Sequence, residues 1–187
     1  MNKKKILICV DMQKDFVDGA LANAEAAGIV PTVVKVISDF DGEVYATRDT
    51  HFADYMDTYE GKNLPVPHCI KGTDGWEYNA LVGAALNAKN ATYVDKITFG
   101  YTEWAKVLLG ASSEAQDAIA ALGAANIESI TLIGTCTDIC VISNALVLRA
   151  LFPGVKIVVI SDACAGLTKE KHEAALEVMR STQITVV

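Results

Sequence analysis

Short runs of β-branched and aliphatic residues alternate along this chain with segments whose apolar residues recur at helical spacing. Several runs, such as KILICV at residues 5–10, are apolar at nearly every position, which is typical of strands covered by helices on both faces. The predicted strands are residues 5–10, 43–47, 91–95, 129–134, 156–161 and 184–187. The predicted helices are about residues 29–40, 75–88, 113–125, 138–151 and 169–181. This alternation predicts a three-layer α/β/α fold around a six-stranded, mainly parallel sheet.

The length of 187 residues fits a single domain, expected to span residues 1–187. With 51% hydrophobic residues the chain can bury a substantial core. The longest stretch without a regular pattern is residues 49–74, which contains His51 and His68, two of the three histidines. Because long irregular segments in compact domains are usually functional, we expect this loop to carry part of a site.

The net charge and the lengths of the apolar runs argue against a nucleic acid partner, a membrane-spanning helix and a signal peptide. The net charge is −7, and basic residues cluster only at residues 3–5, so a nucleic acid partner is not expected. No segment approaches the roughly 20 apolar residues of a membrane-spanning helix, and the run Ile6–Val10 is too short for a signal peptide. The five cysteines are odd in number and stand mostly among apolar neighbours, which indicates free thiols and a cytoplasmic location.

Chemically active side chains directly follow four of the predicted strands. Asp11 follows the first, Asp49 and His51 the second, Lys96 the third, and the segment TCTDIC at 135–140 the fourth. The carboxyl ends of parallel strands meet at one edge of a sheet, where open α/β folds bind ligands. An acid, a possible metal-binding pair, a base and a thiol are therefore expected to share one cavity.

Cys140 is the candidate nucleophile. Asp138 is expected to cap a helix that starts near Ile139, which places Cys140 in the first turn. The free N–H groups and the positive end of the helix dipole would lower the pKa of the thiol and could bind an oxyanion. The alternative is that Cys140 is a small buried apolar residue. A metal clip formed by Cys136 and Cys140 fits less well, because the other cysteines stand alone.

A nucleophilic thiol needs a base and a counter-charge. His172 lies in the polar helical segment KEKHEAALEVMR, where a solvated helix face explains it. Asp11 and Lys96 remain as proton acceptor and stabilising cation. The plainer alternatives are that Asp11 caps a loop and that Lys96 is a solvated strand end.

Several motifs carry a resemblance to a known family. VDMQKDF (10–16), the lysine after the third strand and GTCTDICV (134–141) resemble the isochorismatase-like cysteine hydrolases. RDTH (48–51) and PVPHCIKGT (65–73) resemble the nicotinamidase (pyrazinamidase/nicotinamidase) branch of that family. The resemblance runs from about residue 5 to the C-terminus and implies the isochorismatase-like hydrolase fold.

The resemblance also implies residue roles. The catalytic triad would be Asp11, Lys96 and Cys140, and the backbone N–H groups of Cys136 and Cys140 would form the oxyanion hole. A cis peptide bond is implied between Thr135 and Cys136.

The loop 49–74 is the candidate metal site. Asp49 and His51 are two residues apart, so on an extended chain both side chains point the same way. Carboxylate and histidine suit zinc, iron or manganese, although a polar loop with incidental histidines is an open alternative. The resemblance implies one divalent metal ion, with zinc as the first choice, bound by Asp49, His51, His68 and a fourth residue. We choose Glu60 as the fourth ligand over Asp57, which lies where many nicotinamidases place a histidine.

Phe16, Phe99, Tyr101 and Trp104 flank the catalytic candidates and are expected to line the substrate pocket, with ordinary core packing as the alternative. The segment NLPVPH lacks the tryptophan that many nicotinamidases carry before the proline and histidine. One wall of the pocket is therefore expected to differ from those relatives.

The resemblance implies an amidase that converts nicotinamide, or a similar aromatic carboxamide, to the acid and ammonia through a thioester, as part of NAD salvage. The pyridine nitrogen would then sit on the metal, and the family often forms homo-oligomers. The alternatives are a related hydrolase of a carbamoyl or ureido substrate or of isochorismate, and a catalytically silent scaffold. A non-hydrolytic nucleotide- or flavin-binding module is a further alternative, although the loop DMQKDF is not glycine-rich.

Overall fold

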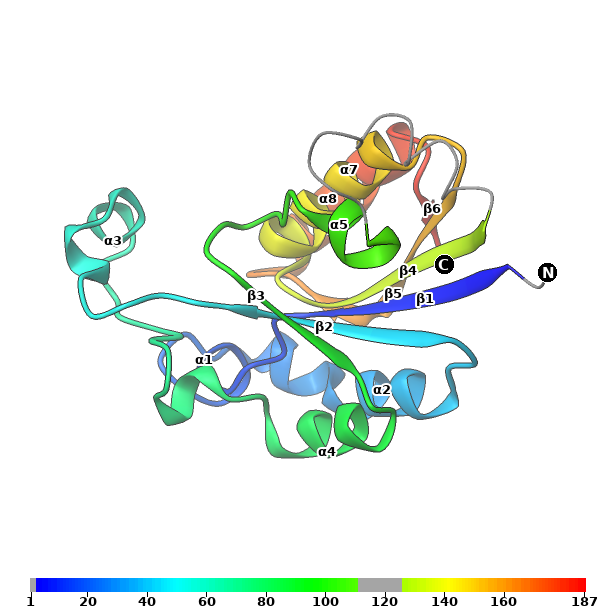
Figure 1. The fold of residues 1–187 in the computed structure, drawn as a ribbon. Coiled ribbons are helices and arrows are strands. Elements are labelled where there is room, and N and C mark those ends of the chain that lie inside the picture. The colour runs from blue at the N-terminus through cyan, green and yellow to red at the C-terminus, as the bar shows by residue number, and fades with distance from the viewer. Residues whose placement is uncertain (1–2, 111–125) are drawn as a thin grey trace.

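The computed structural model describes residues 3–110 and 126–187, which form an α/β fold around one six-stranded sheet (Figure 1). The strands are β1 (Lys4–Val10), β2 (Glu43–Asp49), β3 (Thr92–Lys96), β4 (Ile127–Thr135), β5 (Lys156–Ala165) and β6 (Thr185–Val186). Their order in the sheet is β3-β2-β1-β4-β5-β6, and all neighbouring strands run parallel. The predicted six strands are confirmed, and the sheet is parallel throughout.

The helices agree in part with the sequence prediction. The longer helices are α2 (Ala24–Asp39), α4 (Ala80–Ala88), α7 (Ile142–Leu151) and α8 (Lys169–Ser181). The predicted helix 75–88 starts only at Ala80, because the side chain of Asn79 accepts a hydrogen bond from Leu81 N and caps α4 there. The predicted helix 113–125 lies outside the described residues.

Short elements lie in the connections between the strands and the longer helices. They are α1 (Lys14–Val17), α3 (Tyr59–Asn63), α5 (Trp104–Leu109), the single turns η1 (Tyr55–Asp57) and η2 (Asp74–Trp76), and the wide, π-type turn η5 (Thr137–Val141). In Figure 1, α3 lies at the end of an arm that projects away from the sheet. This arm is part of the long loop 49–74.

Helices cover both faces of the sheet, as the apolar strand patterns predict. Ile6, Ile8 and Val10 of β1 point into a core shared with α5, α7 and α8. Leu7 and Cys9, which alternate with them, point into a second core shared with α2 and α4. Figure 1 shows α5, α7 and α8 on one face of the sheet and α1, α2 and α4 on the other. Burial on both faces explains why nearly every residue of this strand is apolar.

The strand order reverses between β1 and β4, which creates a crevice at the carboxyl ends of the strands. The strand register brings the site segments to this edge. Asp49, the last residue of β2, pairs with Lys96, the last residue of β3. Val10 pairs with Thr47 on one side and with Gly134 on the other. Asp11 therefore emerges between the ends of β2 and β4.

Gly134 allows β1 and β4 to approach closely at this edge. Its φ is +119°, and a Cβ atom there would lie 2.1 Å from Val10 O. A larger residue cannot occupy this position without moving one of the two strands. The following Thr135–Cys136 peptide bond is cis, as the resemblance implies.

All five cysteines are buried and unpaired. Among the described residues, no helix combines the length and the apolar character needed to cross a membrane.

Candidate active site

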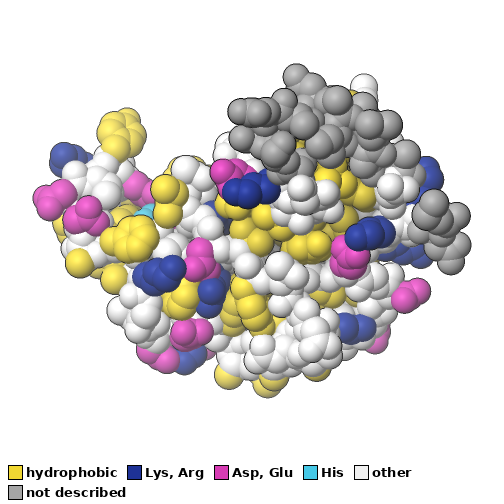
Figure 2. All heavy atoms as spheres, in the orientation of Figure 1, with side chains coloured by type: hydrophobic (Ala, Val, Ile, Leu, Met, Phe, Trp, Pro, Cys, Tyr) yellow, Lys and Arg dark blue, Asp and Glu magenta, His cyan; other side chains and the backbone are white. Residues whose placement is uncertain are grey.

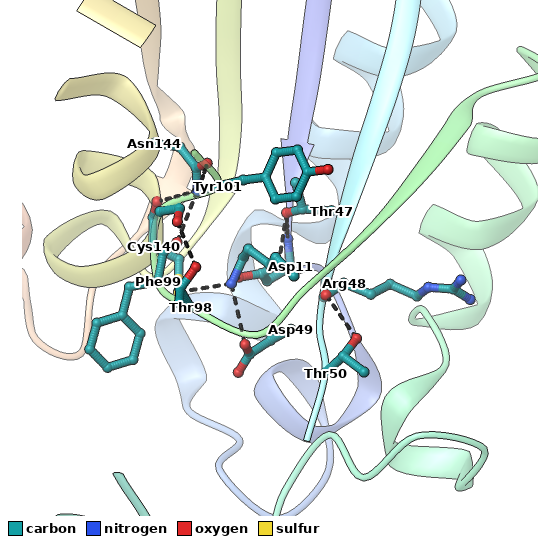
Figure 3. Close-up of polar contacts among 12 residues, drawn as sticks. Asp11, Thr47, Arg48, Asp49, Thr50, Thr98, Phe99, Tyr101, Cys140 and Asn144 are labelled. Atoms are coloured by element: carbon teal, nitrogen blue, oxygen red, sulfur yellow. Dashed lines mark hydrogen bonds and ion pairs between the residues drawn. The ribbon is translucent and has the colours of Figure 1, made fainter. Parts of the chain in front are cut away.

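Lys96 lies between the acid and the thiol that the sequence analysis selected. Its Nζ is 2.7 Å from Asp11 Oδ2, 3.6 Å from Cys140 Sγ and 3.3 Å from Asp49 Oδ1 (Figure 3). Lys96 is 1% exposed and Asp11 is fully buried. The plainer alternatives, a solvated strand end and a loop cap, are therefore wrong for these two residues. The ends of β1 and β3 and the turn η5 thus bring an acid and a thiol into direct contact with one cation.

Thr47 orients the carboxylate of Asp11. Asp11 has a φ of +47°, in the left-handed region that a non-glycine residue rarely adopts. Its N–H lies 3.2 Å from both the carbonyl oxygen and the hydroxyl of Thr47, and the hydroxyl donates to Asp11 Oδ1 at 2.7 Å. Oδ2 is left beside the Lys96 ammonium and accepts no hydrogen bond from the other described residues. This oxygen is free to accept a proton.

The pKa of Cys140 lies well above its ordinary value, which corrects the expectation of a lowered thiol pKa. Burial is the main cause; Lys96 opposes it, while the neighbouring charge of Asp11 adds to it. Burial also raises the pKa of Asp11, against the effect of Lys96. The resting site therefore holds the proton on the Cys140–Asp11 pair, and the Lys96 ammonium compensates the remaining negative charge.

The turn that carries Cys140 differs from the predicted helix start. Asp138 does not cap a helix; its Oδ1 accepts a hydrogen bond from Leu167 N at 2.9 Å. Cys136 O instead accepts from the N–H groups of both Ile139 (3.1 Å) and Val141 (3.0 Å), which widens the turn. Burial raises the pKa of the second thiol, Cys136, to about 11.

His172 contacts this turn, although the sequence analysis placed it on a solvated helix face. The Thr137 hydroxyl and His172 Nδ1 are 2.8 Å apart, and Thr137 is fully buried. No local sequence pattern indicates this contact, because it joins residues from different elements.

The four predicted metal ligands form one cluster. Single donor atoms from Asp49, His51, Glu60 and His68 all lie within 4.8 Å of one another. Asp57, the alternative fourth ligand, is exposed in η1 and lies outside this cluster. The arm that carries α3 delivers Glu60 to the cluster, so the projecting arm completes the site.

The spacing of the donor atoms fits a divalent metal ion. His51 Nε2 lies 3.0 Å from Asp49 Oδ2 and 3.6 Å from Glu60 Oε1, and His68 Nε2 lies 3.7 and 3.9 Å from the same two oxygens. Ligand bonds of about 2.0–2.1 Å in a tetrahedral zinc site separate donor atoms by roughly 3.3 Å. His68 Nδ1 lies 2.8 Å from Val66 O, so its N–H can donate there and leave Nε2 free for a metal.

A cavity of about 270 Å³ lies between the thiol and this cluster. Its lining residues are Phe16, Leu21, Asp49, Glu60, Asn63, Leu64, His68, Phe99, Cys136, Ile139, Cys140 and Leu167. Two of the four predicted pocket aromatics, Phe16 and Phe99, are among them. The prediction is wrong for Trp104, which is fully buried in the core and packs against Tyr101, and neither residue lines the cavity.

A wider hollow of about 710 Å³ adjoins this cavity and shares Glu60, Asn63 and Phe99 with it. The hollow is visible in Figure 2 between the projecting arm and the body of the molecule. His51 and Glu60 line this hollow, so the cluster of Asp49, His51, Glu60 and His68 also borders it.

Asn144 is a buried residue that the sequence analysis missed. Its Nδ2 donates to Cys140 O (2.8 Å) and Phe99 O (3.0 Å), and its Oδ1 accepts from Tyr101 N at 3.0 Å (Figure 3). The same Oδ1 also accepts from Trp104 Nε1 at 2.9 Å. Asn144 therefore joins the thiol turn to the segment that follows Lys96. No sequence signal marks it, since asparagine in a helix has no fixed partner.

An isochorismatase-domain family model matches residues 5–187. The chain belongs to the isochorismatase family. A nicotinamidase/pyrazinamidase from Mycobacterium tuberculosis (strain ATCC 25618 / H37Rv) is 29% identical over 196 residues, covering 98% of each chain. The crystal structure of a nicotinamidase/pyrazinamidase from Bacillus subtilis matches with a TM-score of 0.78 and 30% identity, covering 98% of this chain and 99% of that one.

A third match within the isochorismatase family concerns the metal. The crystal structure of a pyrazinamidase from Pyrococcus horikoshii in complex with zinc matches with a TM-score of 0.77 and 28% identity, covering 98% of both chains. The resemblance and the fold stated from the sequence are thus confirmed, and the non-hydrolytic nucleotide- or flavin-binding module is disfavoured.

Proposed function

We propose that the chain hydrolyses an aromatic carboxamide, with nicotinamide as the leading candidate, to the carboxylic acid and ammonia. The chain is a hydrolase of the isochorismatase family, and its relatives named as nicotinamidases support an amide substrate. The observation that carries the proposal is the position of Lys96 Nζ, 2.7 Å from Asp11 Oδ2 and 3.6 Å from Cys140 Sγ, beside a cavity that Cys140 lines.

In the first step Asp11 accepts the proton of Cys140 while the sulfur attacks the amide carbon. The raised pKa of the thiol disfavours a free thiolate, so proton transfer and attack are expected to occur together. The C–S bond forms and the carbonyl π electrons move to oxygen. Lys96 and the backbone N–H groups of Cys136 and Cys140 stabilise the resulting oxyanion.

In the second step the tetrahedral intermediate collapses. Asp11 returns its proton to the departing nitrogen, the C–N bond breaks, ammonia leaves, and a thioester on Cys140 remains. Water then attacks the thioester while Asp11 accepts one of its protons. Asp11 finally protonates the departing sulfur, which restores the thiol and releases the acid.

Asp49, His51, Glu60 and His68 would hold one divalent metal ion, with zinc as the first choice and iron or manganese as alternatives. Bound there, the ion would supply a Lewis-acid position for the ring nitrogen of the substrate. Asp49 links this cluster to the triad, because its Oδ1 contacts Lys96 and its Oδ2 contacts His51. Asp49 therefore fixes the position of the four-residue cluster relative to Lys96, which contacts the thiol of Cys140.

Phe16 and Phe99 supply aromatic surface to the cavity, which suits a flat ring. Leu64, from the segment NLPVPH that lacks an aromatic residue, also lines the cavity, so the preferred ring can differ from that of relatives with a tryptophan in this segment. We further propose a cytoplasmic role in NAD salvage for a single domain spanning residues 1–187, with homo-oligomers expected. The five free, buried cysteines support a reducing compartment.

An ammonia-release assay over a small amide panel tests the proposal. Nicotinamide, pyrazinamide, benzamide and an N-carbamoyl amino acid are compared, with and without a chelator. We expect nicotinamide or pyrazinamide to react fastest, Cys140→Ala to be inactive although folded, and the advantage of nicotinamide over benzamide to shrink after metal removal. Preferred release from the N-carbamoyl amino acid, or substantial turnover by Cys140→Ala, would contradict the proposal.

A further inference from the structure

The hydrogen bond between Thr137 and His172 joins α8 to the turn that carries the two proposed oxyanion donors. Thr137 Oγ1 and His172 Nδ1 are 2.8 Å apart. Thr137 is fully buried and stands between Cys136 and Cys140 in the chain. A displacement of Thr137 would therefore move the backbone that carries both N–H donors.

His172 is held in place by the start of α8. Thr168 caps this helix by accepting a hydrogen bond from Lys171 N, and His172 N donates to Thr168 O at 2.9 Å. Farther along, Leu176 and Met179 are buried in the core and fix the helix to the sheet. Thr137 is thus anchored to a capped and packed helix instead of a mobile loop.

The connection between β5 and α8 packs closely against this contact at Gly166. A Cβ atom on Gly166 would lie 2.9 Å from Asp138 Oδ1 and 3.0 Å from His172 Cβ. Asp138 also accepts from Leu167 N, beside Gly166. Gly166 therefore lies against both the turn that carries Cys140 and the start of α8.

We propose that His172 is a positioning residue for the oxyanion donors, acting through Thr137. The inference rests on the proposed function, because the donors matter only if an oxyanion forms. With the ring proton on Nε2, Nδ1 accepts the Thr137 hydroxyl and fixes the backbone on both sides of it. Oxyanion donors stabilise charge only within about 2.7–3.1 Å of the oxygen, so a small displacement of the turn lowers the rate.

Matched variants separate this role from simple packing. His172→Leu removes the Nδ1 atom that contacts Thr137. His172→Asn has a side chain similar in shape to leucine but keeps a polar atom near the Nδ1 position. We expect kcat of His172→Leu to fall by roughly tenfold to a hundredfold with KM within about twofold, and His172→Asn to retain most activity. Thr137→Val and Thr137→Ser should behave as the same pair. The double variant His172→Leu/Thr137→Val should lose no more than either single variant.

A second measurement does not depend on amide turnover. Pyridine-3-carbaldehyde reacts with a thiol by forming a C–S bond while the thiol proton moves to the carbonyl oxygen, which then occupies the oxyanion position. Its binding is measured as protection of Cys140 from alkylation. We expect its dissociation constant to rise in His172→Leu by about the factor that kcat falls, and Glu173→Leu, an exposed neighbour on α8, to match the wild type.

The two measurements distinguish failure of this inference from failure of the proposed function. If no amide is hydrolysed but aldehyde binding depends on His172 as expected, the proposed amide substrate is wrong, while the positioning of the two N–H donors by His172 is supported. If the wild type hydrolyses amides and His172→Leu matches it in kcat, the inference is overturned. Equal losses in His172→Leu and His172→Asn, loss of thermal stability alone, or no aldehyde protection in the wild type would overturn it as well.

Discussion

Replacing Asp11 by asparagine is expected to change two reactions of Cys140 in opposite directions. The substitution keeps the shape of the side chain but removes both the base and a negative charge. Without the base, kcat/KM for amide hydrolysis should fall by about 10²- to 10⁴-fold. The thiol, however, loses a neighbour that raises its pKa, while Lys96 remains close to the sulfur. Alkylation of Cys140 should therefore become faster.

The distances set the size of this effect. Lys96 Nζ lies 2.7 Å from Asp11 Oδ2 and 3.6 Å from Cys140 Sγ, so Oδ2 and Sγ are at most 6.3 Å apart, the sum of the two distances. Two negative charges no farther apart than this repel by at least about 2.6 kcal/mol at an effective dielectric constant of about 20. This energy corresponds to a shift of at least about two pKa units. The lower nucleophilicity of a more acidic thiolate offsets about half of the gain, which leaves alkylation at least about tenfold faster.

The assay compares the rate of iodoacetamide labelling at Cys140, located by peptide mapping, with ammonia release at matched metal content. Asp41→Asn, an exposed substitution outside the site, serves as the control. The acceleration should be largest above the raised pKa of Asp11, where this carboxyl is ionised in the wild type, and should vanish below it. Slower or unchanged labelling above that pKa, or hydrolysis within tenfold of the wild type, would refute the reasoning.

Three further predictions concern metal, stability and specificity. Glu60→Gln should weaken zinc binding at least about tenfold in calorimetry, while Asp57→Asn leaves it unchanged. Asn144→Leu should lower the free energy of unfolding in urea by about 3 kcal/mol or more, because buried donors and acceptors, including Trp104 Nε1, lose their partner. Phe99→Ala should raise KM for an aromatic amide several-fold with a smaller change in kcat; an unchanged KM would remove Phe99 from the binding surface.

The fold was predictable because local patterns and topology agree. Residues 5–10 could be assigned to a central strand because burial on both faces selects apolar residues at nearly every position. The convergence of residues 11, 96 and 140 was also predictable, since parallel strands place their carboxyl ends at one edge. Short elements such as α3 were not, because five residues on an arm carry no recognisable period.

Parts of the site depend on contacts that no local pattern specifies. The role of Thr47 beside Asp11 follows from the β1–β2 register, and the contact of His172 with Thr137 joins residues 35 positions apart. The raised pKa of Cys140 reflects burial, which a sequence does not state, whereas the helix-start argument predicted a lowered value. Trp104 could not be separated from a pocket aromatic for the same reason.

The central claim is that Cys140 forms a covalent thioester with the acyl group of the substrate. The most direct test is rapid acid quenching of the enzyme during turnover of nicotinamide, followed by intact-mass and peptide analysis. The account predicts a mass increase equal to the acyl group, located on the peptide that contains Cys140 and absent in Cys140→Ala. Steady turnover by the wild type with no adduct on Cys140 at any quench time, combined with retained turnover in Cys140→Ala, would contradict it.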